Sequence, residues 1–398
     1  MRYLITGGAG FIGSHLADAL VARGDSVLIL DDLSTGSLEN IVGVVASGQA
    51  EFVEGSTCEE ALVDECMERT DACFHLASAV GVKLIVEHSV ASLSRSVRGA
   101  QVVTEGAHRL GRRLLFASTS EIYGKNGGAA LSEHSDRVLG PPSIARWSYS
   151  TAKAVGEAIS LGYHRERGAD NVVVRLFNTV GPRQAGAYGM VLPRFVGQAL
   201  AGEDLTVYGD GSQSRCFAHV HDTVRALVML MDEEGARGTA FNVGCATEIT
   251  ILELAEAVIE RTGSSSGIRM VPYDEAYGEG FEELGRRRPD TSALEQMTGW
   301  KPTRGVEEAI DDVAACERLR AESGAPAHRN GHRNGSAAAH RNGNGNGGTP
   351  AHRNGNGNGG TPAHRNGNGN GNGRTPAHLN GSAAKIGEGA AADPSLNS

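Results

Sequence analysis

Short apolar runs alternate with longer segments of helical spacing in the first part of the chain. Residues 2–6 and 26–30 are apolar runs of strand length, and residues 11–23 between them place apolar side chains on one face of a helix. This strand–helix–strand order predicts two parallel strands of one sheet.

The alternation continues through the middle of the chain. Residues 72–76 and 113–118 are predicted as buried strands, with a long helix over residues 88–110 between them. A second long helix, over residues 147–167, leads into a strand over residues 171–177. The whole order predicts an α/β fold with a doubly wound parallel sheet of the Rossmann type.

The pattern changes twice further along. After Gly181 the elements are shorter, which predicts a Rossmann-type domain over residues 1–180 and a smaller substrate-binding lobe over residues 181–322, with some later segments returning to the main sheet. From Ser323 onward almost nothing is large and apolar, and a Thr-Pro-Ala-His-Arg-Asn-Gly unit recurs. We expect residues 323–398 to be a disordered tail, since they cannot bury enough surface to offset the entropy of ordering.

Composition narrows the function classes. The formal net charge is −10 and the first 320 residues carry no long basic run, which argues against nucleic acid as the main ligand. The six cysteines form no CxxC pair, and we interpret them as reduced thiols. No apolar run is long enough for a membrane span, and a strand beginning at residue 2 leaves no room for a signal peptide. A cytoplasmic protein is therefore expected, and the tail histidines are interpreted as part of a linker, with no metal site predicted.

Glycines follow the first predicted strand at GxxGxxG spacing. Gly7, Gly10 and Gly13 lie between that strand and a helix, where bare Cα atoms allow a tight turn and a close approach to a pyrophosphate. The helix N-terminus then offers free N–H groups to the phosphates. Asp31 ends the second strand 18 residues after Gly13, where a carboxylate would accept hydrogen bonds from ribose hydroxyls and repel a 2′-phosphate. The pattern predicts NAD rather than NADP.

A tyrosine and a lysine stand four residues apart on the helix predicted over residues 147–167. Tyr149 and Lys153 therefore share one helix face, and a lysine beside a phenol is expected to lower its pKa and prepare it to accept a proton. Ser118 and Thr119 end the strand before this helix, at the sheet edge where such folds bind ligands. Together these residues predict proton transfer beside the dinucleotide.

These motifs resemble the extended short-chain dehydrogenase/reductase family, in its nucleotide-sugar epimerase and dehydratase branch. The resemblance covers about residues 1–320 and rests on residues 7–13, 31, 75–77, 118–124, 149, 153, 175–178, 181–183, 207–211 and 287–290. It implies an NAD site formed by Gly7, Gly10, Phe11, Ile12, Gly13, Asp31, Asp32, Ser34, Thr35, Gly36, Leu76, Ala77, Ser118, Tyr149 and Lys153. It implies a UDP-sugar site formed by Thr119, Glu121, Asn178, Arg183, Arg215 and Arg287, and a homodimer.

The reaction depends on a few side chains. Typical 4-epimerases have a small or neutral residue where Glu121 stands, and common 4,6-dehydratases have Asp where Ser120 stands. The Thr-Ser-Glu form is similar to that of UDP-glucuronate decarboxylases, although GDP-mannose 4,6-dehydratases have it too. Residues 145–147 and 212–217 also look like the decarboxylase pattern, in which an arginine, here Arg215, reaches the sugar.

The leading hypothesis is NAD-dependent decarboxylation of UDP-glucuronate to UDP-xylose through a 4-keto sugar. In it, Tyr149 with Lys153 takes the proton from the 4-hydroxyl, and Thr119 orients that hydroxyl. Glu121 lies by the departing carboxylate, and Arg215 helps to protonate C5. The alternatives are 4-epimerisation of UDP-glucuronate or UDP-glucose, 4,6-dehydration, and a non-catalytic NAD-binding scaffold, against which the Tyr149–Lys153 pair argues.

The roles of Glu121 and Arg215 stay open. At two other places the sequence departs from the family pattern. Glu121 could form only a salt bridge, and Arg215 could bind only phosphate. The family usually has Asp where Ser56 stands, and Thr-Asn where residues 95–96 are Arg-Ser. The contact to adenine must therefore differ.

Overall fold

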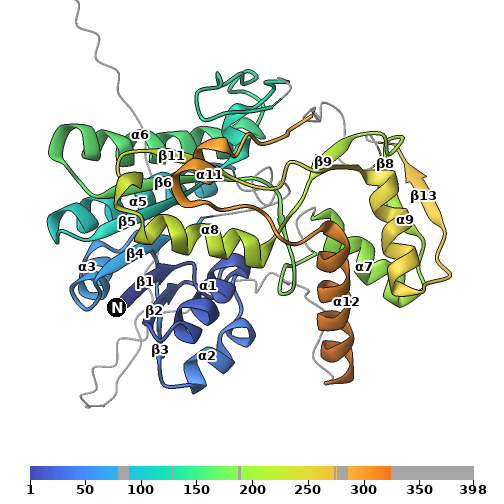
Figure 1. The fold of residues 1–398 in the computed structure, drawn as a ribbon, viewed down its shortest axis with the longest axis horizontal. Helices are drawn as coiled ribbons and strands as arrows, with labels where there is room; N and C mark the ends of the chain where they lie inside the picture. Colours follow the sequence, from blue (N-terminus) through green and yellow to red (C-terminus); the bar gives the residue numbers. More distant parts are fainter. Residues whose placement is uncertain (79–88, 128–129, 187–189, 273–274, 276–285, 324–398) are drawn as a thin grey trace, which may run out of the picture. The chain divides into compact units, whose positions relative to one another are not determined.

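A computed structural model describes residues 1–78, 89–127, 130–186, 190–272, 275 and 286–323, all within one compact unit that runs from Met1 to Arg333. The core of this unit is a seven-stranded sheet in the order β11-β6-β5-β4-β1-β2-β3, in which every neighbouring pair is parallel (Figure 1). The strands are β1 (Arg2–Thr6), β2 (Ser26–Asp31), β3 (Ala50–Glu54), β4 (Ala72–His75), β5 (Arg113–Thr119), β6 (Asn171–Leu176) and β11 (Ala240–Val243). The predicted doubly wound α/β fold is confirmed.

The strands alternate their side chains between two apolar layers, because successive residues of a strand point to opposite faces. Tyr3 and Ile5 of β1 pack with α1 and α8 on one face, whereas Leu4 packs with α3 and α5 on the other. Both faces are covered, which explains why these strands read as continuous apolar runs. The covering helices are α1 (Phe11–Ala22), α3 (Glu60–Glu68), α5 (Ser89–Arg109), α6 (Trp147–Arg167) and α8 (Val220–Asp232), with α5 packed against α6 (Figure 1).

A second apolar cluster lies beyond the main sheet. It is formed by α7 (Val191–Ala201), α9 (Ile251–Thr262), α12 (Val306–Glu322) and the pair of parallel strands β8 (Leu205–Tyr208) and β13 (Ile268–Val271). Segments after residue 181 also rejoin the main sheet, since β11 pairs with β6 and α8 packs against α1. The boundary at residues 180 and 181 stays a prediction, and the predicted disordered tail lies outside the described residues from 324 onward.

Short elements complete the fold. Two strand pairs join its parts: β7 (Thr179–Val180) with β10 (Ala218–His219), and β9 (Ser214–Cys216) with β12 (Glu248–Thr250). The described residues also form the helices α2 (Val42–Ala46) and α11 (Ser292–Thr298) and the single turns η1 (Leu38–Asn40), η2 (Ser120–Tyr123) and η3 (Glu234–Ala236). Among the described residues no helix is both long and apolar enough to cross a membrane.

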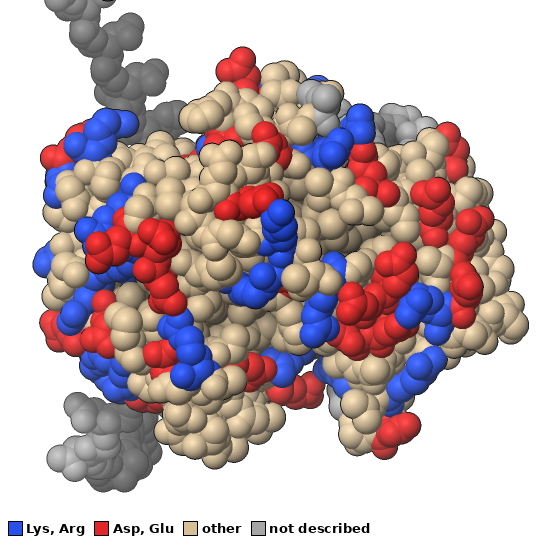
Figure 2. Space-filling model, viewed as in Figure 1, with Lys and Arg blue, Asp and Glu red and all other residues tan. Residues whose placement is uncertain are grey.

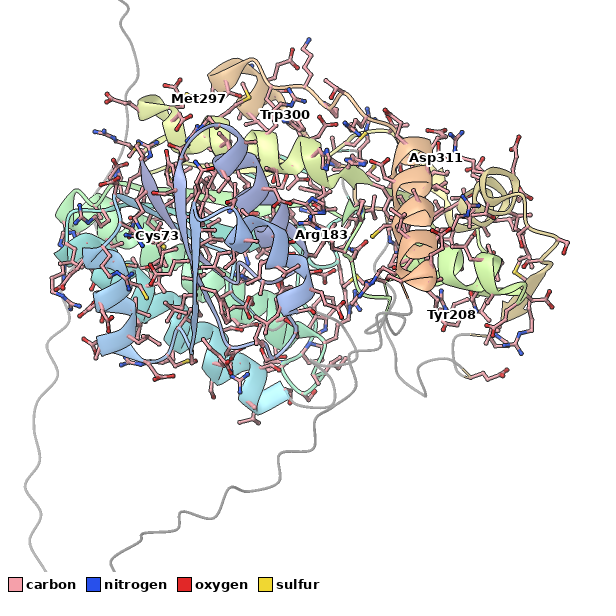
Figure 3. The ribbon with its side chains drawn as sticks, turned by 90° about the horizontal axis from the view of Figure 1, so that it is seen from below. Cys73, Arg183, Tyr208, Met297, Trp300 and Asp311 are labelled. Atoms are coloured by element: carbon pink, nitrogen blue, oxygen red, sulfur yellow. The ribbon has the colours of Figure 1, made fainter. Side chains whose placement is uncertain are left out.

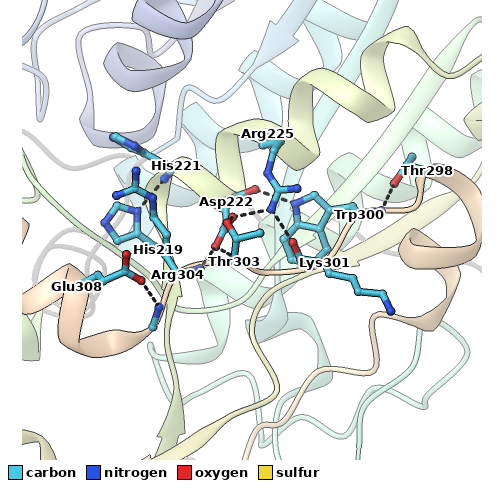
Figure 4. Close-up of polar contacts among 11 residues, drawn as sticks. His219, His221, Asp222, Arg225, Thr298, Trp300, Lys301, Thr303, Arg304 and Glu308 are labelled. Atoms are coloured by element: carbon cyan, nitrogen blue, oxygen red, sulfur yellow. Dashed lines mark hydrogen bonds and ion pairs between the residues drawn. The ribbon is translucent and has the colours of Figure 1, made fainter.

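One buried carboxylate fixes the segment that leads into α12. Asp222 of α8 accepts hydrogen bonds from the backbone N–H groups of Thr303 and Arg304 at 2.8 and 2.9 Å, and its main-chain carbonyl accepts one from Trp300 at 3.0 Å (Figure 4). Burial works to raise the pKa of Asp222, but these bonds and the Arg225 guanidinium outweigh it and lower the pKa. The segment between α11 and α12 is therefore tied to the layer that covers the sheet.

Acidic and basic side chains are mixed on the face of the molecule shown in Figure 2. On the face seen in Figure 2, blue and red residues alternate over the described part of the chain rather than gathering by sign. Such a surface gives no extended attractive field for a polyanion.

Candidate active site

A cavity of about 700 Å³ lies along the carboxyl edge of the main sheet. It is lined by residues that end or directly follow β1, β2, β4, β5 and β6, where parallel sheets of this kind bind ligands. Nineteen of the predicted site residues line it: Gly7, Gly10, Phe11, Ile12, Gly13, Asp31, Asp32, Ser34, Thr35, Leu76, Ala77, Ser118, Thr119, Tyr149, Lys153, Asn178, Arg183, Arg215 and Arg287. The two that do not are Gly36 and Glu121, each of which lies next to a lining residue.

Two glycines of the predicted motif have no room for a side chain. Gly7 has φ +74°, and a Cβ there would lie 2.7 Å from the Ala77 backbone nitrogen. A Cβ on Gly13 would lie 2.2 Å from the carbonyl oxygen of Gly7. The turn and the first helical turn of α1 thus pack directly on the sheet edge, and the start of α1 opens onto the cavity at Phe11 and Ile12. The backbone forms the cradle that a pyrophosphate needs.

Asp31 lies at the end of β2 with its carboxylate facing this turn. One oxygen accepts a hydrogen bond from the Ala9 N–H at 3.0 Å, and the other accepts one from the Leu33 N–H at 2.8 Å. Burial raises the pKa of Asp31, and these two bonds oppose the rise. A carboxylate has about four acceptor sites, so acceptor capacity is left for ribose hydroxyls. The residues present fit NAD.

The predicted substrate residues other than Glu121 line the rest of the cavity, here called the sugar-facing half, together with Tyr149 and Lys153 of α6. The Lys153 ammonium donates to the Ala117 carbonyl at 2.7 Å, and burial lowers its pKa to about 8 against the opposing charge of Glu157. The pKa of Tyr149 is raised, first by burial and then by Glu121, while a hydrogen bond with Thr119 opposes the rise. The predicted lowering of the Tyr149 pKa by Lys153 is wrong for the protein alone, because burial dominates and the ammonium is directed to the main chain.

Glu121 is the second residue of the turn η2, which directly follows β5, and its N–H donates a hydrogen bond to the Thr119 hydroxyl at 3.2 Å. One of its carboxylate oxygens accepts a hydrogen bond from Arg287 at 2.5 Å, and the other lies 3.6 Å from the Arg146 guanidinium. Burial works to raise the pKa of Glu121, but the charges of Arg287 and Arg146, with a smaller effect of Arg215, outweigh it and lower the pKa. Glu121 is therefore an anion inside a group of guanidinium groups.

This arrangement differs from the role expected for Glu121. Its carboxylate is hydrogen-bonded to Arg287, which compensates its charge. Repulsion between Glu121 and a substrate carboxylate therefore has little physical basis here, and the salt-bridge interpretation describes its contacts. Arg287, predicted to bind substrate, lines the cavity while it is bonded to Glu121.

The other predicted substrate residues converge from distant parts of the chain. Arg215 on β9 lines the cavity and donates to the Ser214 carbonyl at 2.8 Å. Asn178 donates to the Cys216 carbonyl at 3.1 Å. Arg183 has φ +64°, unusual for a residue with a side chain, and its guanidinium lies 2.7 Å from the Asp18 carboxylate, beside α1 (Figure 3). The structure brings all three to the cavity.

Sequence reasoning missed residues at both ends of the sugar-facing half. Arg146 lines the cavity three residues before Tyr149, and only its place in the Ala-Arg-Trp stretch gave a signal. Arg194 and Tyr208 line the far end, where the guanidinium carbon lies 4.2 Å from the centre of the Tyr208 ring (Figure 3). A stacked aromatic surface of this kind suits a flat nucleobase.

Comparison with known proteins identifies the family of the chain. Residues 3–244 match the model of the NAD dependent epimerase/dehydratase family. The chain belongs to this family. It is an enzyme of a family that uses NAD, and NAD is its cofactor.

Two curated relatives are decarboxylases. The chain is 40% identical over 313 residues to a UDP-N-acetyl-alpha-D-glucosaminuronate decarboxylase of Bacillus cytotoxicus, covering 78% of this chain and 96% of the relative. It is 35% identical over 302 residues to UDP-glucuronic acid decarboxylase 2 of Arabidopsis thaliana, covering 76% of this chain and 65% of the relative. The fold resembles the solved UDP-glucose 4-epimerase of Thermotoga maritima with UDP-glucose, with a TM-score of 0.73, 28% identity, and coverage of 81% of this chain and all of that one.

Proposed function

We propose that this enzyme decarboxylates the uronic acid of a UDP-sugar, with UDP-glucuronate as substrate and UDP-xylose as product. The observation that carries the proposal is the pair of guanidinium groups, of Arg146 and Arg287, that contact Glu121. They lie near Thr119 and Tyr149 and provide positive charge where a sugar carboxylate would lie. The names of the two decarboxylase relatives support the same reaction. The Bacillus cytotoxicus relative is named for an N-acetylated uronic acid, so this sugar should be included in the substrate test.

NAD, when bound, supplies the redox chemistry by taking a hydride from C4 of the sugar and later returning it. The residues that would hold it are the glycine turn, the start of α1, Asp31 and Ser118. The Ser118 hydroxyl is buried and has no hydrogen-bond partner within the described chain, so a ligand can supply one. The protein's own part is then to move protons and to stabilise charge on the sugar.

In this proposal Tyr149, which lines the cavity, takes the proton of the sugar 4-hydroxyl. Its pKa in the protein alone is high, so its phenolate forms only when further positive charge lies nearby, and Lys153 is the buried cation one helical turn away. Thr119, already hydrogen-bonded with Tyr149, orients the same hydroxyl. Deprotonation of O4 and formation of a 4-keto sugar go together.

Loss of CO2 follows from the position of the new carbonyl group. The carboxylate on C5 is now β to the C4 ketone, so the C–C bond can break and leave its electron pair in an enolate. The O–H of Tyr149 stabilises the enolate oxygen at C4. A proton delivered to C5 completes the exchange, and Arg215, directly or through water, is the proposed group for this step. The product keeps the ring and loses only CO2.

The deciding experiment is the product formed from UDP-glucuronate in the presence of NAD. Release of CO2 with a UDP-pentose, followed by mass spectrometry, supports the decarboxylase. Inversion at C4 with the carboxylate retained assigns a 4-epimerase, and loss of water from a UDP-hexose assigns a 4,6-dehydratase. Absence of turnover on all these sugars and on UDP-N-acetylglucosaminuronate would overturn the proposal.

We further propose a homodimer in the cytoplasm. Helices α5 and α6 pack side by side, and their outer faces include the exposed side chains of Val90 and Val155, which are 77% and 37% accessible. Pairing of these helices with those of a second copy would form a four-helix bundle. Light scattering at micromolar concentration tests it, and a monomer would contradict it.

A further inference from the structure

Arg95 lines the end of the cavity that would hold NAD, and the cofactor contacts described above do not use it. It lies in the second turn of α5, and its side chain is 53% exposed. Its guanidinium nitrogen Nη1 lies 3.6 Å from the carboxylate of Asp32, a partly exposed residue that directly follows β2 and also lines the cavity. The ion pair therefore joins α5 to the end of β2 at the rim of the cavity.

The helical turn that carries Arg95 is packed against the loop that follows β3. The Cys58 thiol donates a hydrogen bond to the Arg95 carbonyl at 3.6 Å. One turn further along α5, a Cβ on Gly99 would lie 2.6 Å from the Thr57 hydroxyl, so the helix backbone approaches this loop closely. The guanidinium group thus extends from a backbone whose position the loop fixes.

The adenine of a bound NAD would lie beside this ion pair. In a Rossmann-type site the pyrophosphate lies at the glycine turn after β1, and the ribose lies at the carboxylate that ends β2, here Asp31. The next space along the sheet edge is at the end of β3, because the strand order is β1-β2-β3. The residues that line this space include Gly55, Thr57 and Arg95.

The loop after β3 uses polar groups of its own within itself. The Ser56 N–H donates to the Glu59 carboxylate at 3.2 Å, and the Ser56 hydroxyl accepts a hydrogen bond from the Cys58 N–H at 3.2 Å. These groups are engaged in the loop and not directed at the edge of a base. A guanidinium group can instead bind the flat face of a base, because the π-system is negative there and attracts a cation.

We propose that Arg95 binds the face of the NAD adenine and that Asp32 holds the guanidinium group over it. A partly exposed ion pair adds little to the stability of the fold, so its effect is expected on the bound cofactor. Removing Arg95 should raise the dissociation constant of NAD and leave kcat at saturating NAD within a few-fold, because adenine takes no part in hydride transfer. The inference concerns retention of NAD and holds whichever sugar reaction the enzyme performs.

The test compares two dinucleotides that differ only in the base. Dissociation constants of NAD and of nicotinamide cytosine dinucleotide, whose base has a smaller face, are measured by calorimetry on the full chain as wild type, Arg95→Ala and Arg98→Ala. Arg98 lies on the same helix, is 45% exposed and pairs with Glu60, so it is the matched control. In Arg95→Ala, NAD binding should weaken about 3- to 30-fold and the preference for NAD over the cytosine dinucleotide should fall. The control should keep both wild-type values.

Equal weakening of both dinucleotides would overturn the inference, because Arg95 would then act on the phosphates or riboses that the two share. An unchanged NAD affinity would overturn it as well. The part assigned to Asp32 is tested by a double-mutant cycle with Asp32→Asn, in which the double variant should lose less NAD affinity than the two single losses combined. Additive losses would refute that part. None of these measurements involves CO2 release, so their failure is distinct from failure of the proposed function.

Discussion

The two halves of the cavity are built in different ways. The dinucleotide half is mostly backbone: two glycines that cannot carry a Cβ, the start of α1, and a carboxylate held by main-chain N–H groups. The sugar-facing half is mostly charged side chains, with Glu121, Arg146, Arg215 and Arg287 brought together from four segments. Backbone geometry is set locally, whereas the balance of charges depends on the complete fold. The first half therefore fixes the cofactor, and the second fixes the reaction.

The largest effect is expected where the two halves meet. Tyr149→Phe should reduce turnover by at least ~10²- to 10⁴-fold, because it removes the group that accepts the first proton. NAD and UDP binding should stay close to wild type, since Phe keeps the packing. Steady-state kinetics with calorimetry check this. A variant with substantial residual turnover would place proton transfer elsewhere.

Charge balance in the sugar-facing half is tested next. Arg287→Met removes the hydrogen-bonded partner of Glu121, and we expect a loss of about 1–3 kcal/mol in the free energy of unfolding, measured with denaturant. The double variant Arg287→Met with Glu121→Gln should recover part of that loss, since no uncompensated anion is left. An additive double variant would mean that the pair is not coupled. Because the pKa of Glu121 is lowered in the fold, the stability it contributes is present above its unfolded pKa and is lost as the pH falls through the folded pKa.

The dinucleotide half is tested at Asp31. Asp31→Ala should weaken NAD binding by about 1–3 kcal/mol, the usual cost of losing a hydrogen bond to a charged group. Asp32→Ala, the neighbouring carboxylate at the same strand end, is the control and should have a smaller effect. Calorimetric titration with NAD and NADP measures both. A wild type that prefers NADP would contradict the interpretation of Asp31.

A smaller, pH-dependent effect is expected at Lys153. Its pKa is lowered by burial to about 8, so its charge is lost as the pH rises through that value. Turnover should fall there if the charge assists Tyr149. Stability should change in the opposite sense. Between about 8 and the ordinary lysine pKa of 10.5, the unfolded chain binds more protons at this group, so its contribution to stability becomes more favourable as the pH rises. Turnover rates and denaturant unfolding, both measured from pH 7 to 10, would separate the effect on catalysis from the effect on stability. A turnover rate that does not change with pH over this range would exclude a role for the Lys153 charge in catalysis.

The smallest effect is expected outside both halves. Deleting residues 325–398 should leave kcat and KM nearly unchanged, because every site residue lies before Ser323. A shorter deletion, of residues 350–398, is the matched control. A folded truncation that had lost most of its activity would show that the tail takes part in catalysis or assembly.

The sequence by itself determined the sheet and the cofactor end of the site. Strand–helix alternation and the glycine spacing are local features, so the doubly wound fold and the NAD family follow from residues close together in the chain. It also gave most of the sugar-facing residues, because they stand in family motifs. What it did not give was their contacts. Burial raises the Tyr149 pKa, Glu121 is paired with Arg287, and Arg146 lines the cavity. These features depend on residues up to 166 positions apart. Only the tertiary structure decided these points, because burial and charge pairing are set by which distant segments pack together.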